Sequence, residues 1–113
     1  MVSGLYIQRK HNEHILEIYL QNHTGGTSNA PYELIKDKGL IEIAGCGFGC
    51  VLVKSEVIRE VGYPQFVYKS AIDHKDTLSE DTYFCGKTRE KGFKIFADTS
   101  IFCDHIGSYV FKV

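Results

Sequence analysis

The segment that most constrains the fold of this chain runs from residue 79 to residue 98, because it predicts a helix followed at once by a strand. Ser79 is a favoured N-cap residue, the turn after it is acidic, and Gly92 is a natural C-terminal stop. Apolar side chains then recur at every second position of FKIFAD (93–98), which is the spacing of a half-buried strand. A helix that leads directly into a strand favours an α/β fold.

Other segments agree with this class. SEVIREVG (55–62) has a capping Ser55, apolar residues at helical spacing and a final glycine, which predicts a second helix. HILEIYL (14–20), in which Glu17 is surrounded by apolar residues, fits either an extended segment or a short buried helix. Extended segments are predicted for VSGLYIQR (2–9), LIEI (40–43), CVLV (50–53) and SIFCDHIG (100–107). CVLV is apolar on both faces and is expected to be a buried strand.

A chain of 113 residues is long enough for one domain. We therefore expect a single α/β domain over residues 1–113, with a mixed sheet and two or three helices. The polar, glycine-containing stretch QNHTGGTSNAP (21–31) predicts a flexible loop. We see no internal repeat and no linker between domains.

The charge balance excludes several classes of partner. The formal net charge is −1, from 13 basic and 14 acidic side chains, so no basic excess indicates nucleic-acid binding. The longest unbroken apolar stretch, CVLV, is too short to cross a bilayer. The first ten residues lack the apolar core of a signal peptide, and we therefore expect a cytoplasmic location.

The chain has four cysteines: Cys46, Cys50, Cys85 and Cys103. An even number is compatible with disulfides, but without a signal peptide we expect reduced thiols. A zinc site that includes Cys46, Cys50, Cys103 and His105 is a further alternative. Structural zinc sites usually have two tight pairs of ligands, whereas Cys85 stands alone on a predicted helix. Buried free cysteines that act as small hydrophobic residues are the favoured interpretation.

Glu80 and Asp81 are the first candidate catalytic residues. In the first helical turn, the free backbone N–H groups and the helix dipole favour the charged form of both carboxylates. An ionised carboxylate suits a general base that removes a proton from a hydroxyl group as a new bond forms. The same position also stabilises an ordinary helix, so both interpretations stay open on these residues alone.

Two other features could contribute to a site. His105 follows a predicted strand beside Asp104 and could bind a divalent cation, or it could be a hydrogen-bonded structural histidine. Gly45, Gly47 and Gly49 interrupt an apolar run, which lets a ligand or another backbone come close. GCGFG lacks the Gly-Lys-Ser/Thr ending of a P-loop and is a weak phosphate-binding signal. A surface for a ligand and tight strand packing are equally compatible with it.

Taken together and in this order, these pieces resemble the C-terminal half of a family 2 glycosyltransferase with the GT-A fold. The resemblance covers residues 2–10 and about 41–107, through VSGLYIQRK, AGCGFGCVLVKSEVIREVGYPQF and LSEDTYFCGKTREKGFKIFADTSIFCDHIG. Its most specific part is an acidic pair at a helix start, a glycine that ends the helix, a strand, and then the histidine of DHIG.

The resemblance implies a partial, Rossmann-like GT-A fold and a role for each candidate residue. Asp81 matches the general base that deprotonates the acceptor hydroxyl in inverting members, and Glu80 matches its acidic neighbour. His105 matches a position that completes the coordination of Mn²⁺ or Mg²⁺ beside the donor diphosphate. Gly45, Gly47 and Gly49 match the strand and loop that line the cleft on the acceptor side. The implied substrates are a nucleotide-sugar donor and a saccharide or other hydroxyl acceptor.

The family also has an N-terminal nucleotide-binding half with an Asp-x-Asp motif, and this sequence contains no such motif. The expectation is an acceptor-and-base half that acts with a donor-binding half from another polypeptide or another part of a longer protein. The alternative is a non-catalytic, truncated glycosyltransferase-like module that binds a saccharide or a protein partner. Because the missing half would pack against this one, we also expect an exposed sheet edge and self-association.

Overall fold

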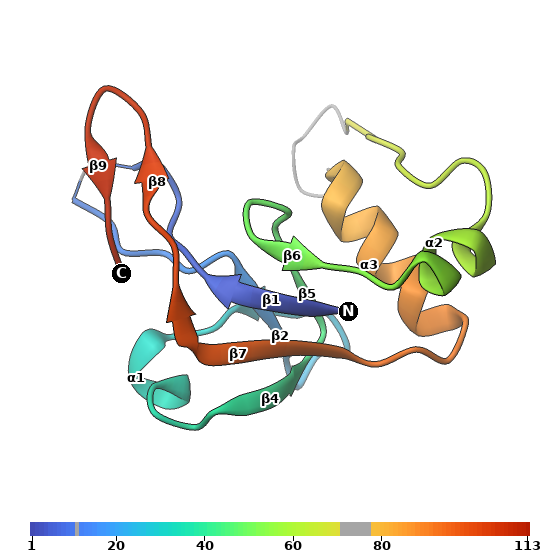
Figure 1. The fold of residues 1–113 in the computed structure, drawn as a ribbon, viewed down its shortest axis with the longest axis horizontal. Helices are drawn as coiled ribbons and strands as arrows, with labels where there is room; N and C mark the ends of the chain where they lie inside the picture. The colour runs from blue at the N-terminus through green and yellow to red at the C-terminus, as the bar shows by residue number, and fades with distance from the viewer. Residues whose placement is uncertain (11, 71–77) are drawn as a thin grey trace.

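The N-terminal strand β1 (Val2–Leu5) lies inside the main sheet, next to a strand from the far end of the chain (Figure 1). In this computed structural model, β1 is parallel to β7 (Ile95–Phe102) and antiparallel to β6 (Val51–Leu52). β4 (Leu40–Ile43) runs antiparallel along the other side of β7 and completes a mixed sheet of order β4-β7-β1-β6. The structure describes residues 1–10, 12–70 and 78–113.

The core lies against the two central strands. Leu5, Ile95 and Ala97 are each 0% exposed, and they belong to one cluster of buried hydrophobic residues. The alternation of FKIFAD predicted this buried face, and it is confirmed by Ile95 and Ala97, while Phe93 is half-buried. The extended region predicted for 93–98 and the one predicted at 100–107 join into a single strand, β7, that ends at Phe102.

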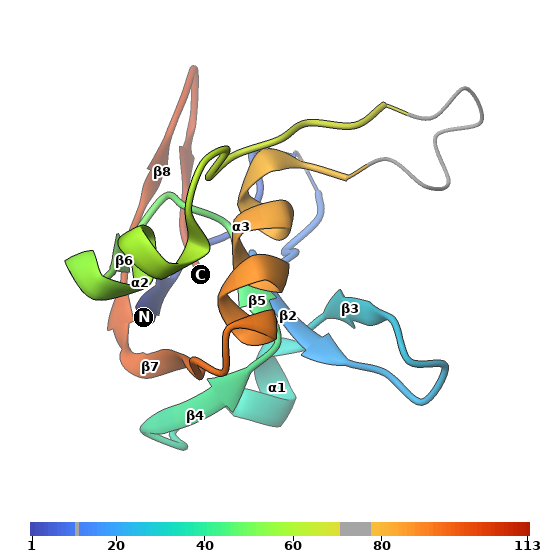
Figure 2. The ribbon, with the colours of Figure 1, turned by 90° about the vertical axis from the view of Figure 1, so that its right-hand side faces the viewer.

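A second sheet is antiparallel and has the order β3-β2-β5. It consists of β2 (Ile18–Gln21), β3 (Thr27–Asn29) and β5 (Gly45–Cys46). The ambiguous segment 14–20 is therefore extended, since Leu16 also forms an isolated bridge with Ile7. The loop predicted for 21–31 is shorter than expected, because β3 lies within it and forms a hairpin with β2 that projects from the body of the domain (Figure 2).

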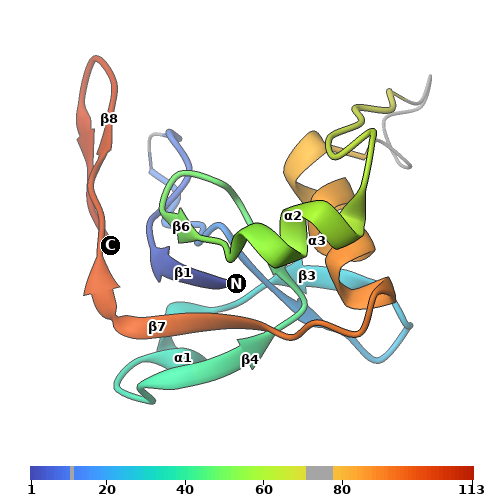
Figure 3. The same cartoon turned by 45° about the vertical axis from the view of Figure 1, so that its right-hand side comes forward.

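In the described residues, three helices accompany the sheets: α1 (Tyr32–Ile35), α2 (Ser55–Val61) and α3 (Glu80–Glu90). Helices α2 and α3 lie side by side at one end of the molecule (Figure 3). The predicted limits of α2 are confirmed by Gly62, whose φ of 70° suits a glycine after a helix. Lys54, however, occupies the N-cap position, and no side chain caps this helix, so the capping role predicted for Ser55 is wrong.

Helix α3 is held in place by aromatic side chains. Phe84 is 1% exposed, stacks on Phe66 at 5.1 Å between ring centroids, and meets Phe48 edge-on at 5.3 Å. Phe84 therefore faces the interior, whereas Tyr83 is half-buried. Phe48 and Phe66 thus connect α3 to the turn after β5 and to the segment after α2.

The buried strand predicted for CVLV is wrong. Only Val51 and Leu52 form a strand, β6, which lies at the edge of the main sheet, and Leu52 is 76% exposed. A run of apolar residues indicates burial only where another layer covers both faces, and an edge strand lacks that cover. The chain ends in a small hairpin of β8 (His105–Ile106) and β9 (Val110–Phe111). Within the described residues, no helix has the length and apolarity needed to cross a membrane.

Candidate functional site

Asp81 lies in the first turn of α3, as the sequence predicted, and its side chain is held from two directions. Its Oδ1 accepts hydrogen bonds from the Ser79 hydroxyl at 2.5 Å and from the Thr82 backbone N–H at 2.8 Å. The Ser79 and Thr82 hydroxyls are themselves 2.8 Å apart. Ser79 is the N-cap residue, but its hydroxyl binds Asp81 and Thr82 side chains and caps no backbone N–H. These contacts orient the carboxylate, and both hydrogen bonds from described residues end on Oδ1.

Glu80 differs from its neighbour. Its side chain is exposed, whereas that of Asp81 is half-buried. The next residue, Thr82, lines a depression of about 250 Å³ that runs along α3 past Tyr83 and Gly86. The acidic pair therefore divides into one oriented, half-buried carboxylate and one solvated carboxylate.

The glycine run packs closely on the side chain of Tyr6. The Gly49 N–H donates a hydrogen bond of 2.9 Å to the Tyr6 hydroxyl. A Cβ atom on Gly47 would overlap that hydroxyl, and one on Gly49 would lie 2.6 Å from Cζ of the ring. A Cβ on Gly45 would meet the Cβ of Cys85 on α3 at 3.3 Å. All three glycines allow close packing, which is one of the two interpretations that the sequence left open.

Two carboxylates and two tyrosine hydroxyls share this region. The Tyr19 hydroxyl donates a short hydrogen bond to Oε2 of Glu17. Burial raises the pKa of Tyr6 to about 12, and the charges of Glu17 and Asp81 add to this shift. Burial, the bond to Glu17 and the charge of Asp81 also raise the pKa of Tyr19. The charges of Glu17 and Asp81 therefore both act on these two hydroxyls.

His105 reaches the same region from the C-terminal hairpin. Its Nδ1 lies 2.8 Å from the carbonyl oxygen of Ile7, so Nδ1 carries the proton and donates. The imidazole also meets the Tyr6 ring edge-on, with centroids 5.5 Å apart. In the neutral imidazole, this hydrogen bond leaves Nε2 available as a ligand, and a backbone carbonyl on the other nitrogen is a common support of metal-binding histidines. Asp104 is exposed and pairs instead with Lys112 at 3.9 Å.

The cysteines form two separate pairs. The Cys85 thiol donates to the carbonyl oxygen of Cys46 at 3.6 Å, and the Cys103 and Cys50 sulfurs are 2.9 Å apart. A hydrogen bond with Cys85, together with burial, raises the pKa of the Cys46 thiol. In the part of the chain that the structure describes, no group of three or more His, Cys, Asp or Glu side chains is arranged to hold a metal ion. His105 could therefore supply one ligand to a metal, with the others coming from elsewhere.

Of the predicted site residues, Gly47, Gly49 and His105 pack against Tyr6, whereas Asp81 acts on the Tyr6 hydroxyl through its charge. Glu80 is exposed at the start of α3, and Gly45 packs against Cys85. Tyr6, Glu17 and Tyr19 are the members of this region that sequence reasoning missed. Glu17 could have been found, because it is a carboxylate inside an otherwise apolar segment. No sequence pattern indicated that Tyr6 belongs to the site, because its position depends on pairing between segments that are distant in the sequence.

The fold and this region define a compact α/β domain with a mixed sheet and three helices, in which an oriented carboxylate begins the longest helix. Comparison with protein-family models, with curated proteins and with solved structures finds no match to this chain.

Proposed function

We propose that this chain is the acceptor-and-base half of an inverting glycosyltransferase of family 2, with a partial GT-A fold. The observation that carries the proposal is Asp81, whose Oδ1 is fixed by Ser79 and Thr82 at the start of α3. The strand that follows α3 leads to His105, in the order that the resemblance requires. His105 packs against Tyr6, and the charge of Asp81 acts on the Tyr6 hydroxyl, which supports a common site for the candidate base and the candidate metal ligand.

In the proposed reaction, Asp81 removes the proton of an acceptor hydroxyl. With Oδ1 already engaged, Oδ2 receives that proton while the hydroxyl oxygen attacks the anomeric carbon of the donor sugar. The bond from the anomeric carbon to the diphosphate breaks, and its electron pair leaves with the nucleoside diphosphate. Attack from the face opposite the leaving group inverts the configuration. Fixed orientation of the carboxylate is the contribution that α3 makes to this step.

The donor side of the site needs groups from outside this chain. We propose that a donor-binding half, on a second polypeptide or elsewhere in a longer protein, supplies the Asp-x-Asp ligands that this sequence does not contain. Nε2 of His105 would be one further ligand to Mn²⁺ or Mg²⁺, held in orientation by the Ile7 carbonyl. The bound ion would neutralise charge on the leaving diphosphate.

Nucleotide-sugar binding tests this proposal directly. The chain is mixed with UDP- and GDP-sugars, with and without Mn²⁺, and its melting temperature is followed together with release of nucleoside diphosphate. With a donor-binding half supplied, we expect a rise in melting temperature that requires Mn²⁺ and is lost in His105→Gln. If no nucleotide sugar changes the melting temperature when a donor-binding half is present, the proposal is wrong.

Asp81→Asn is the sharper variant once a donor-binding half is supplied. The amide keeps the shape of the side chain but cannot accept the proton, so the transfer rate should fall by about 10²- to 10⁴-fold. Binding of the donor should be unchanged. Glu56→Gln is the matched control, because Glu56 is an exposed carboxylate in the first turn of α2, away from Tyr6. Transfer by Asp81→Asn at the normal rate would remove Asp81 as the base.

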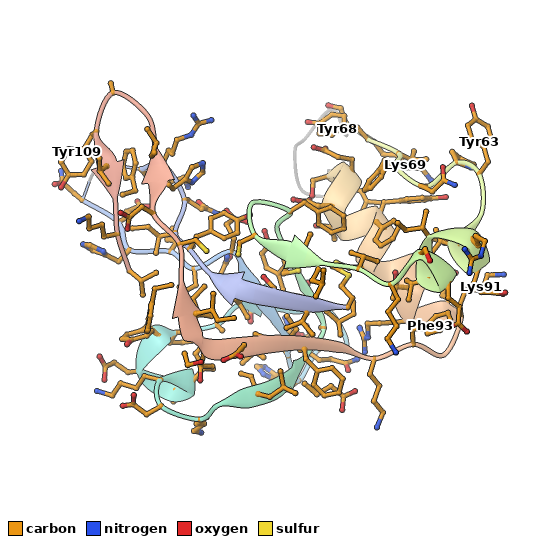
Figure 4. All side chains as sticks on the ribbon, in the orientation of Figure 1. Tyr63, Tyr68, Lys69, Lys91, Phe93 and Tyr109 are labelled. Atoms are coloured by element: carbon orange, nitrogen blue, oxygen red, sulfur yellow. The ribbon has the colours of Figure 1, made fainter. Side chains whose placement is uncertain are left out.

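A second candidate function, saccharide binding without catalysis, is favoured by exposed aromatic side chains. Tyr63 is 94% exposed, Phe66 49% and Tyr68 61%, all in the segment between α2 and α3. Figure 4 shows Tyr63 and Tyr68 projecting from this segment. Aromatic faces of this kind offer apolar contact area with a polar edge. Saccharide binding that survives Asp81→Asn but is lost in Tyr68→Ala, without any nucleotide-sugar effect, would support this candidate over the enzyme.

A further inference from the structure

The thiols of Cys50 and Cys103 lie close together although 53 positions separate them in the sequence. Their sulfur atoms are 2.9 Å apart, and both side chains are half-buried. Cys50 stands in the turn before β6, and Cys103 directly follows β7. A disulfide needs a sulfur–sulfur distance of about 2.0 Å, so the two atoms must approach by about 0.9 Å.

The backbone on both sides of this pair is fixed by β1. The Gly4 N–H donates to the Cys50 carbonyl at 3.0 Å, and the Cys103 N–H donates to the Leu5 carbonyl at 2.8 Å. Gly4 also leaves the space that the thiols occupy, because a Cβ atom there would lie 2.9 Å from the Cys50 sulfur. Neighbouring residues of one strand thus hold the two cysteines in register with each other.

The other two cysteines provide an internal comparison. Cys46 is 0% exposed and Cys85 is 2% exposed, and the Cys85 thiol binds the Cys46 carbonyl inside the core. An oxidant in solution reaches half-buried sulfur far more readily than buried sulfur, because attack requires direct access to the thiolate. The two pairs should therefore differ in their reaction with the same reagent.

We propose that Cys50 and Cys103 form a reversible disulfide when the protein meets a small disulfide such as oxidised glutathione. The thiolate of one cysteine attacks the glutathione disulfide, which gives a mixed disulfide and releases one glutathione thiolate. The second cysteine thiolate attacks the protein sulfur of that mixed disulfide and releases the second glutathione thiolate. The protein loses two electrons and its two thiol protons, and one glutathione disulfide is reduced to two glutathione molecules.

The bond would fix the surroundings of Tyr6. Cys50 follows Gly49, whose N–H binds the Tyr6 hydroxyl, and Cys103 precedes His105, whose ring contacts the Tyr6 ring. The disulfide would therefore close a covalent bridge between the glycine run and the C-terminal hairpin. This inference depends on the thiol geometry alone and holds whether or not the chain transfers sugars.

The test equilibrates the protein in a glutathione redox buffer and measures the number of free thiols, the disulfide connectivity and the melting temperature. Oxidation should reduce the number of reactive thiols in denatured protein from four to two, and peptide mapping should find Cys50 joined to Cys103. The bridge constrains the unfolded chain, so the melting temperature should rise by on the order of 10 °C and return to its starting value with excess dithiol. Hydrogen exchange at the Gly4 and Cys103 amides should slow on oxidation.

Variants separate the proposal from general oxidation. Cys50→Ser and Cys103→Ser should each lose the rise in melting temperature, whereas Cys46→Ala should keep it. Four thiols that persist after equilibration would overturn the proposal. A glutathione adduct without an internal bond, a bond between two chains, or a Cys46–Cys85 bond as the product would also overturn it.

Discussion

Tyr6 is the residue on which the candidate site depends most, and its position explains why residues 47 and 49, after β5, are glycines. Its hydroxyl occupies the space that a side chain at position 47 would need, and its ring fills the space above Gly49. Because Tyr6 is 7% exposed, the ring cannot swing out to make room without exposing core surface. Gly47 and Gly49 thus leave the space that the buried side chain of Tyr6 occupies.

Gly47→Ala tests this relation at the level of one methyl group. The new Cβ would overlap the Tyr6 hydroxyl and lie 3.1 Å from Oε2 of Glu17, so we expect a loss of about 1–3 kcal/mol in the free energy of unfolding. Urea denaturation measures this change. Gly86→Ala is the control, because its Cβ would meet nothing within 4 Å in α3 and should stabilise by about 0.5–1 kcal/mol. Equal effects from both variants would contradict the packing role of Gly47.

The raised pKa of Tyr6 predicts how stability changes at alkaline pH. Burial raises this pKa from 10.0 to about 12, so the folded protein binds the phenol proton more tightly than the unfolded chain does. The stabilisation is complete below pH 10 and is lost as the pH rises from 10 towards 12. In Tyr6→Phe, the free energy of unfolding should fall less steeply over this interval. Urea denaturation at the two ends of the interval checks the slope, and identical slopes would refute this prediction.

At the scale of single elements, α3 is anchored by one side of its surface. Phe84 packs on Phe66 and Phe48, while Lys87 and Glu90, which are more exposed, form an ion pair at 3.1 Å. An exposed pair of this kind contributes little to stability. The aromatic contacts therefore fix the position of α3, and with it the position of Asp81.

Phe84→Ala should lower the free energy of unfolding by about 3–5 kcal/mol, because it removes a ring that is 1% exposed and leaves a cavity. Phe66→Ala removes a ring that is 49% exposed, and its cost should be smaller. Chemical denaturation of both variants gives the comparison. A larger cost for Phe66→Ala would mean that the segment after α2, and not Phe84, determines where α3 lies.

Both longer helices and most strands could be predicted from the sequence, because the patterns that indicate them lie within short segments of the chain. The glycine after each helix and the alternation at Ile95 and Ala97 depend only on neighbouring residues. The edge position of β6 and the hairpin strand β3 could not be predicted, since each depends on which distant strand lies beside it. The same limit applies to the site, where Asp81 was found from its helix start but its relation to Tyr6 was not.

At the scale of the whole molecule, the edge of the main sheet at β6 predicts self-association. Leu52 is 76% exposed on this edge, and unpaired strand edges with apolar side chains tend to pair with other chains. Sedimentation should therefore give about twice the monomer mass of 12.8 kDa at moderate concentration. Leu52→Lys should restore the monomer, because charge on an edge strand opposes pairing.

Leu40→Lys is the matched control for this experiment. Leu40 is 59% exposed on β4, the strand at the opposite edge of the sheet. If Leu40→Lys dissociates the dimer and Leu52→Lys does not, the interface lies at β4, and the prediction of an interface at β6 is wrong. A single species of 12.8 kDa in the unmodified protein would exclude self-association.

The parallel pairing of β1 with β7 also has a consequence for how the chain reaches its native state. Val2 lies opposite Phe96, so β1 finds its parallel partner only after the residues from position 3 to position 96 have been synthesised. Contacts between such distant segments make folding slow, because a long loop must close before they form. During translation the edge of β1 that faces β7 therefore stays without its partner for this interval, in which the nascent chain is exposed to aggregation.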